Sequence, residues 1–122
     1  MKPNNLKRIL KILEYDENVL SYERGYLEIA DEDVSSVEGV LFVTNKRVFF
    51  NVDTIDKVIF REYKYENISK VEKNIENTKN ILNFKIQNKI ISIEFKNITS
   101  KTLEKIFIIT SNKIKSYKPL FY

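Results

Sequence analysis

Apolar residues near the N-terminus follow a helical spacing. Four of them recur at intervals of three and four, which places them on one face of a short helix. This stripe consists of Leu6, Ile9, Leu10 and Leu13. The stripe can dock on the chain's own domain, on a second copy or, because Lys7, Arg8 and Lys11 lie off it, on a membrane surface. Two or three helical turns give little membrane affinity alone, which favours docking on protein.

After the first helix the pattern changes to short runs rich in Ile, Val, Phe and Tyr, separated by polar turns. These runs predict seven strands, of which the first is bent. The strands are Val19–Tyr22 continuing as Tyr26–Ile29, Gly39–Thr44, Arg47–Val52, Lys57–Tyr63, Ile68–Lys73, Ile81–Gln87 and Ile90–Lys96. Because the chain has only two glycines, we expect Asn to take the turn positions that need a left-handed backbone.

The most distinctive strand pair is the hairpin between Gly39 and Val52. Its arms are joined by Asn45 and Lys46 alone, which is the length of a tight turn. Near this turn both arms are apolar at successive positions, so we expect them to be covered on both faces. Arg47 follows the turn, and the returning alternation predicts that it points to solvent.

Helical spacing returns near the C-terminus. One face of this second predicted helix carries Leu103, Ile106, Phe107, Thr110 and Ile114. Thr99 or Ser100 is the expected N-cap, and Lys113 and Lys115 lie where the helix dipole favours cations. The sequence thus divides into an N-terminal amphipathic helix (residues 1–16), a domain (17–117) that ends in a helix over about 99–116, and an apolar tail (118–122).

Composition excludes several kinds of chemistry. With 43% apolar and 31% charged residues, the chain is expected to form one globular domain. It contains neither Cys nor His, which removes disulfides, thiolate metal sites and the commonest general base. No apolar run approaches the roughly 20 residues of a membrane span, and the N-terminus lacks the features of a signal peptide. We therefore expect a cytoplasmic protein.

Charge is unevenly distributed within the net value of +4. Residues 23–38 carry six acidic side chains against Arg24, a net charge of −5 in an otherwise basic chain. Asp31, Glu32 and Asp33 lack the alternate spacing and the turn glycine of a calcium loop, so a solvated acidic loop is the better interpretation.

No other pattern indicates catalysis. The Ser–Lys pairs are adjacent residues in ordinary turn or cap positions. The two glycines are isolated, so no phosphate-binding loop is expected. The sequence predicts a protein that is not an enzyme, with no catalytic residues, no cofactor, no metal site and no small-molecule substrate.

Three motifs in order resemble those of a known family. They are Leu13-Glu-Tyr-Asp-Glu-Asn-Val-Leu20, Gly39-Val-Leu-Phe-Val-Thr-Asn-Lys-Arg-Val-Phe-Phe50 and Tyr65-Glu-Asn-Ile-Ser-Lys-Val71. Together they are similar to bacterial pleckstrin-homology-like (PH-like) domains of the short stand-alone type with an N-terminal helix. The resemblance implies a mostly β (α+β) fold, a split barrel of seven antiparallel strands in two near-orthogonal sheets, capped by a C-terminal α-helix.

The resemblance also guides the choice of partner. Eukaryotic relatives bind inositol phosphates through basic residues near the first hairpin loop, whereas the matching loop here is acidic and would repel them. A generic contact with anionic membrane lipid through Lys46, Arg47, Lys57, Arg61 and the N-terminal helix remains an alternative.

Nucleic-acid binding is a second alternative, which the pI permits but no aromatic–basic motif supports. Some bacterial relatives are thought to assemble, so a homo-oligomer is a further expectation. We therefore expect a binding or scaffold module that contacts a protein partner or itself, through the N-terminal stripe or the tail residues Leu120, Phe121 and Tyr122.

Overall fold

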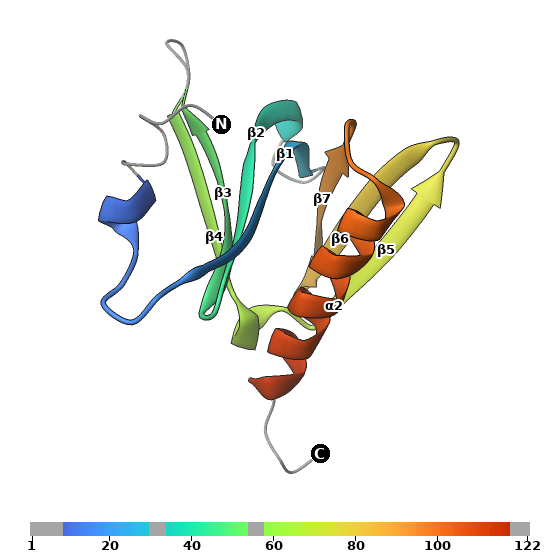
Figure 1. Cartoon of the computed structure of the whole chain (residues 1–122). Helices are drawn as coiled ribbons and strands as arrows, with labels where there is room; N and C mark the ends of the chain where they lie inside the picture. The colour runs from blue at the N-terminus through green and yellow to red at the C-terminus, as the bar shows by residue number, and fades with distance from the viewer. Residues whose placement is uncertain (1–8, 30–33, 54–57, 118–122) are drawn as a thin grey trace.

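The computed structural model describes residues 9–29, 34–53 and 58–117 (Figure 1). Within these ranges, a helical turn at residues 9–12 is followed by seven strands and one long helix. The elements are β1 (Val19–Ile29), β2 (Val34–Thr44), β3 (Arg47–Asp53), β4 (Val58–Lys64), the short 3-10 helix η2 (Tyr65–Asn67), β5 (Lys70–Glu76), β6 (Lys79–Ile86), β7 (Lys89–Phe95) and α2 (Ser100–Ser116).

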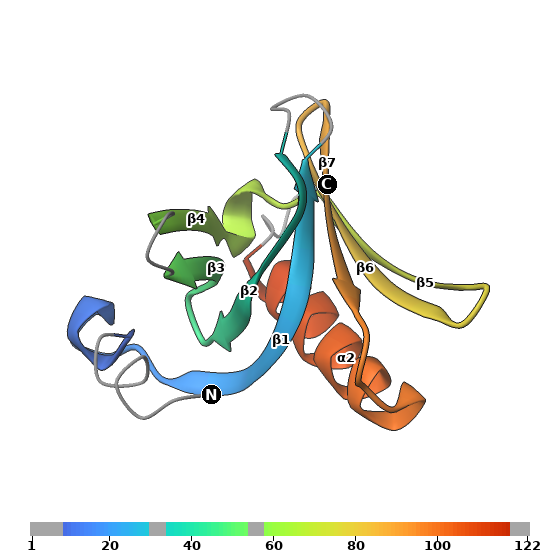
Figure 2. The same ribbon diagram turned by 90° about the horizontal axis from the view of Figure 1, so that it is seen from above.

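All seven strands belong to one antiparallel sheet in the order β4-β3-β2-β1-β7-β6-β5. β1 joins the two halves, because it pairs with β2 from Val19 to Ile29 but with β7 only through Tyr26–Ile29. Beyond that shared segment the four-strand and three-strand halves turn away from each other, and α2 lies in the angle between them (Figure 2). The predicted PH-like fold class of seven antiparallel strands and a C-terminal helix is confirmed, but the two predicted sheets are joined through β1 into one continuous sheet.

The only two glycines of the chain face each other across the β1–β2 ladder. A Cβ on Gly25 would lie 2.8 Å from a methyl carbon of Ile93, and one on Gly39 would lie 2.6 Å from the backbone oxygen of Asn51. Both positions therefore require glycine for close approach of neighbouring strands, although neither has a positive φ.

The main core fills the angle between the two halves. Alternate residues of the strands point inward, and the apolar face of α2 covers them. Its fully buried members include Leu27, Ile29, Leu41, Val43, Val48, Phe50, Tyr65, Ile68, Leu82, Phe84, Ile91, Ile93, Phe95, Leu103 and Ile106. The helix begins as predicted, because the hydroxyl of Thr99 accepts a hydrogen bond from the backbone N–H of Thr102 (3.1 Å).

A smaller apolar cluster lies on the opposite face of β2 and β3. Phe42 and Phe49 stack there with ring centroids 5.0 Å apart, and Ile9 of the N-terminal turn covers them at 1% exposure. Tyr22 and Phe60 extend this aromatic row to the neighbouring strands, at 5.8 and 5.4 Å. The hairpin is thus covered on both faces as predicted, and the described part of the N-terminal helix docks on its own domain.

The turns differ from the prediction. The turn after β5 contains only Asn77 and Thr78, so β5 and β6 are longer than expected. Left-handed φ values occur at Ser36, Asn77, Thr78 and Gln87, so Asn does not take all such positions among the described residues. At the β2–β3 link φ is not positive at either residue; instead, the Thr44 hydroxyl accepts hydrogen bonds from the N–H groups of Lys46 and Arg47.

The predicted division into residues 1–16, 17–117 and 118–122 stays a prediction, since residues 1–8 and 118–122 lie outside the described part of the chain.

Replacing Ile9 by Ala should lower the free energy of unfolding by about 2 kcal/mol, because it opens a cavity above the two Phe rings. Leu10→Ala is the matched control. Leu10 is 59% exposed, so the loss of unfolding free energy should stay below about 0.5 kcal/mol. Chemical denaturation of both variants measures the difference. Equal losses would mean that the N-terminal turn does not dock through Ile9.

Candidate functional site

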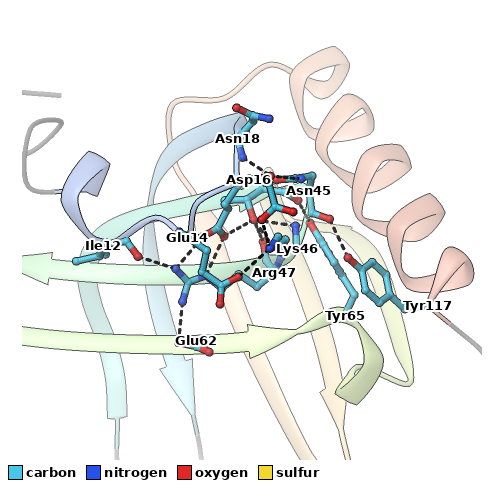
Figure 3. Close-up of polar contacts among 12 residues, drawn as sticks. Ile12, Glu14, Asp16, Asn18, Asn45, Lys46, Arg47, Glu62, Tyr65 and Tyr117 are labelled. Carbon is cyan, nitrogen blue, oxygen red and sulfur yellow. Dashed lines mark hydrogen bonds and ion pairs between the residues drawn. The ribbon is translucent and has the colours of Figure 1, made fainter.

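Arg47 is buried at the tip of the β2–β3 hairpin, with 7% exposure, so the prediction that it points to solvent is wrong. Its guanidinium forms a fork with Glu17, with Nε–Oε2 at 2.8 Å and Nη2–Oε1 at 2.9 Å. It also donates to Glu62 on β4 (2.8 Å) and to the backbone oxygen of Ile12 (3.0 Å; Figure 3). The reason is tertiary: the segment that precedes β1 folds back over this residue.

Glu17 is the buried partner of Arg47, with a side chain that is wholly inaccessible. Besides Arg47, it accepts hydrogen bonds from the Thr44 hydroxyl (2.6 Å) and from the N–H of Glu14 (3.0 Å). Burial alone would raise the pKa of this carboxyl, but the hydrogen bonds and the charge of Arg47 outweigh it and lower the pKa below its usual 4.5. Glu17 is therefore an ionised, fully bonded carboxylate.

Lys46, the second predicted contact residue at the tip, is also engaged. Its ammonium group pairs with Asp16 and lies 3.3 Å from a carboxylate oxygen of Glu14. The adjacent Asn45 donates to the backbone oxygen of Asp16 (2.9 Å) and accepts from the N–H of Asn18 (2.7 Å; Figure 3). We call these contacts between residues 12–18 and residues 44–47 the hairpin clasp.

The C-terminal end of α2 reaches the same tip. The hydroxyl of Tyr65 donates to the backbone oxygen of Thr44 (2.6 Å), and that of Tyr117 donates to the backbone oxygen of Asn45 (3.2 Å; Figure 3). Burial raises the pKa of Tyr65, which keeps its phenol protonated as a donor. The hairpin tip is thus a structural junction of three segments and not a free basic patch.

The structure separates the other predicted contact residues. Ile9 is buried and Leu10 is exposed, so the N-terminal stripe does not form one continuous surface. Arg61 is half-buried on β4. Leu6 and Lys57 lie outside the described residues, as do Asp31–Asp33 and the tail residues 120–122.

A groove that the sequence did not reveal runs beside the first half of β1. It encloses about 560 Å³ and is lined by Leu10 and Leu13 of the N-terminal segment, by residues 17–22 and by Lys105 of α2. We call it the edge groove. Leu20 and Tyr22 are 40% and 47% exposed there, whereas Leu13 is half-buried. The sequence signal that could have revealed the groove is the pair of large apolar residues, Leu20 and Tyr22, at alternate positions of β1.

The groove borders a basic face of α2. The residues that α2 presents to solvent at intervals of three and four are Lys101, Lys105, Ile108, Asn112 and Lys115. Of these residues only Lys105 lines the groove, so the α2 side of the groove carries one positive charge.

Within the described residues, no three His, Cys, Asp or Glu side chains gather as metal ligands would. None of the helices in that part of the chain has the length and apolar character of a membrane span.

The buried ion pair should matter far more than an exposed one. Arg47→Met leaves the Glu17 carboxylate buried without its partner and should cost about 3–5 kcal/mol of unfolding free energy. Arg24→Met breaks a pair of the same length, 2.8 Å, between half-exposed side chains and should cost less than about 1 kcal/mol. The double variant Arg47→Met/Glu17→Gln should lose less unfolding free energy than Arg47→Met alone. Additive losses from the two single variants would contradict the coupling of Arg47 and Glu17.

Acid should weaken the clasp. Because folding lowers the pKa of Glu17, its contribution to stability is present above its usual value of 4.5 and is lost as the pH falls below it. Glu17→Gln should reduce stability at neutral pH and flatten the decline between about pH 5 and pH 2. Thermal melts across this pH range measure the decline in stability, with a substitution of the exposed Glu66, Glu66→Gln, as control. A wild-type slope in Glu17→Gln would show that other groups dominate.

The described geometry can be compared with known proteins. A family model described as a bacterial PH domain matches residues 13–115. Among solved structures, the Vps36 N-terminal PH domain is similar with a TM-score of 0.69 and 10% identity, over 86% of this chain and 84% of that one. A DUF1696 family protein with a pleckstrin-homology domain from Shewanella loihica has a TM-score of 0.61 and 16% identity, over 91% and 98%.

The hSac2 domain from human phosphoinositide phosphatase Sac2 is also similar, with a TM-score of 0.61 and 15% identity over 98% of this chain and 87% of that one. At such identities these structures show a common fold alone. A comparison with curated protein sequences gave no match. Because the family model spans most of the chain, from the β1 approach to the end of α2, the chain belongs to the bacterial PH domain family.

Proposed function

We propose that this protein is a non-enzymatic binding module that contacts protein through the edge groove. The observation that carries the proposal is the groove itself, which combines exposed Leu10, Leu20 and Tyr22 with a concave shape. Apolar side chains gathered in an open groove are typical of interaction sites. Membership of the family supports a binding role, and a cytoplasmic location remains a prediction.

The occupied hairpin tip argues against lipid binding through the basic residues Lys46 and Arg47. Lys46 and Arg47 already pair with acidic residues of the chain's own clasp. A peripheral contact with anionic membrane lipid remains a second candidate, favoured by the lysines on the exposed face of α2.

Nucleic-acid binding has less support. Lys70, Lys73 and Arg24 form ion pairs with neighbouring acids, so positive charge is interleaved with negative charge on the sheet surface. Such interleaving does not build the continuous basic track that a phosphate backbone requires.

Self-association is the form of protein contact that is simplest to test. Light scattering of the full chain over a range of concentrations should show a species heavier than the monomer if a second copy occupies the groove. A chain lacking residues 1–14 has no groove wall with Leu10 and Leu13. The same measurement on this chain should show less of the heavier species.

A heterologous partner is tested with phage-displayed random peptides selected on the full chain. The variant Leu10→Ser/Leu20→Ser/Tyr22→Ser should weaken selected peptides by about tenfold or more, because it removes the exposed apolar lining. Ile75→Ser/Ile90→Ser is the matched control, since these two isoleucines are 57% and 55% exposed and lie outside the groove.

Two outcomes together would overturn the proposal: a monodisperse monomer at all concentrations, and no selected peptide that distinguishes the groove variant from the control. Salt-sensitive binding to phosphatidylserine vesicles under the same conditions would then favour the lipid alternative.

A further inference from the structure

The backbone of β1 has an open edge over its first half. β2 pairs with β1 along its whole length, whereas β7 pairs only with Tyr26–Ile29. At Gly25 β7 is already in close contact with β1. In the described parts of the chain no strand pairs with residues 19–24 on the β7 side. Alternate residues there present backbone N–H and C=O groups that another strand can bond.

The edge groove runs along this open edge. Val19, Leu20, Ser21 and Tyr22 all line it, although successive side chains of a strand point to opposite faces. The groove is also lined from both faces of the sheet, by Leu10 and Leu13 on the outer side and by Lys105 of α2 on the inner side. Lining from both faces places the groove beside the strand, where an added strand would lie.

The groove has walls of two kinds. The N-terminal segment, which packs on the outer face of β2 and β3, supplies the apolar Leu10 and Leu13. α2, which packs on the inner face of the sheet, supplies Lys105. Because side chains of an added strand would alternate between these walls, one set would meet apolar carbon and the other set would meet positive charge.

From these observations we infer that the open edge of β1 binds an extended protein segment in which apolar residues alternate with acidic ones, added to the sheet as a strand. This inference rests on the proposed protein-binding function and specifies its partner. Backbone hydrogen bonds would supply affinity, and the two walls would supply specificity.

The strand edges of a second copy fit this site less well. β4 carries Arg61, Glu62 and Lys64, and β5 carries Lys70, Glu72, Lys73 and Glu76, so neither edge strand has the negative charge that the Lys105 wall favours. The open edge of β1 in a second copy carries one acidic and one basic residue, Glu23 and Arg24. Charge therefore favours a partner other than this chain.

The test uses two pools of acetylated, amidated hexapeptides. Both have Val, Ile, Leu or Tyr at alternate positions; the others are Glu or Asp in the acidic pool and Lys or Arg in the basic pool. Fluorescence anisotropy with the full chain should show that the acidic pool binds more tightly. Lys105→Glu should weaken the acidic pool about tenfold, because attraction becomes repulsion.

Lys85→Glu is the matched control, since it makes the same charge change at an exposed site on β6 outside the groove and should change binding less than about twofold. Amide hydrogen exchange of the full chain should slow within residues 19–25 when the acidic pool is bound. Two further peptides carry N-methyl groups on one or the other set of alternate backbone nitrogens. One of the two should no longer bind, because its modified nitrogens are those that would donate hydrogen bonds to β1.

Equal binding of both pools, an unchanged affinity in Lys105→Glu, or exchange protection on β4 or β5 in place of β1 would overturn the inference. If displayed peptides still depend on Leu20 and Tyr22 but lack acidic residues, the proposed function stands and the inference fails. If phosphatidylserine vesicles bind through Lys105 and neither pool does, a lipid partner replaces the peptide.

Discussion

The pairing of β1 with β2 along its full length is the constraint on which the rest of the structure depends. It lets one strand belong to both halves of the sheet, and the angle between those halves holds the main core. The pairing is possible because Gly25 and Gly39 face each other where neighbouring strands approach too closely for a Cβ. Because β1 is longer than its pairing with β7, its first half has an open edge. The fold and the proposed binding site therefore share one cause.

The hairpin clasp then decides how the N-terminal segment lies. Arg47 bonds to Glu17, Glu62 and the backbone of Ile12, which holds this segment against the outer face of β2 and β3. A buried ion pair gives little net stability relative to an apolar replacement, but it penalises other arrangements because each charge needs its partner. The clasp therefore acts mainly to position the segment, including the wall that carries Leu10 and Leu13.

Local patterns predicted the elements well because each element satisfies local rules. The period of apolar residues separated seven strands from the C-terminal helix, and Thr99 could be named as an N-cap from its position before the helical stripe. The apolar run on both arms of the hairpin correctly predicted cover on both faces. The turns were less predictable, since Thr44 stabilises the hairpin link through its side chain without a left-handed residue.

By itself, the sequence determined the order of the elements, the family resemblance and the absence of His and Cys chemistry. Only the tertiary structure decided that Arg47 is buried, that the two glycines oppose each other and that β1 has a groove beside it. The physical reason is distance along the chain: Arg47 and Glu17 are 30 residues apart, and Lys105 comes from another element entirely. Periodicity reports which face of an element is apolar, whereas register and packing determine what that face meets.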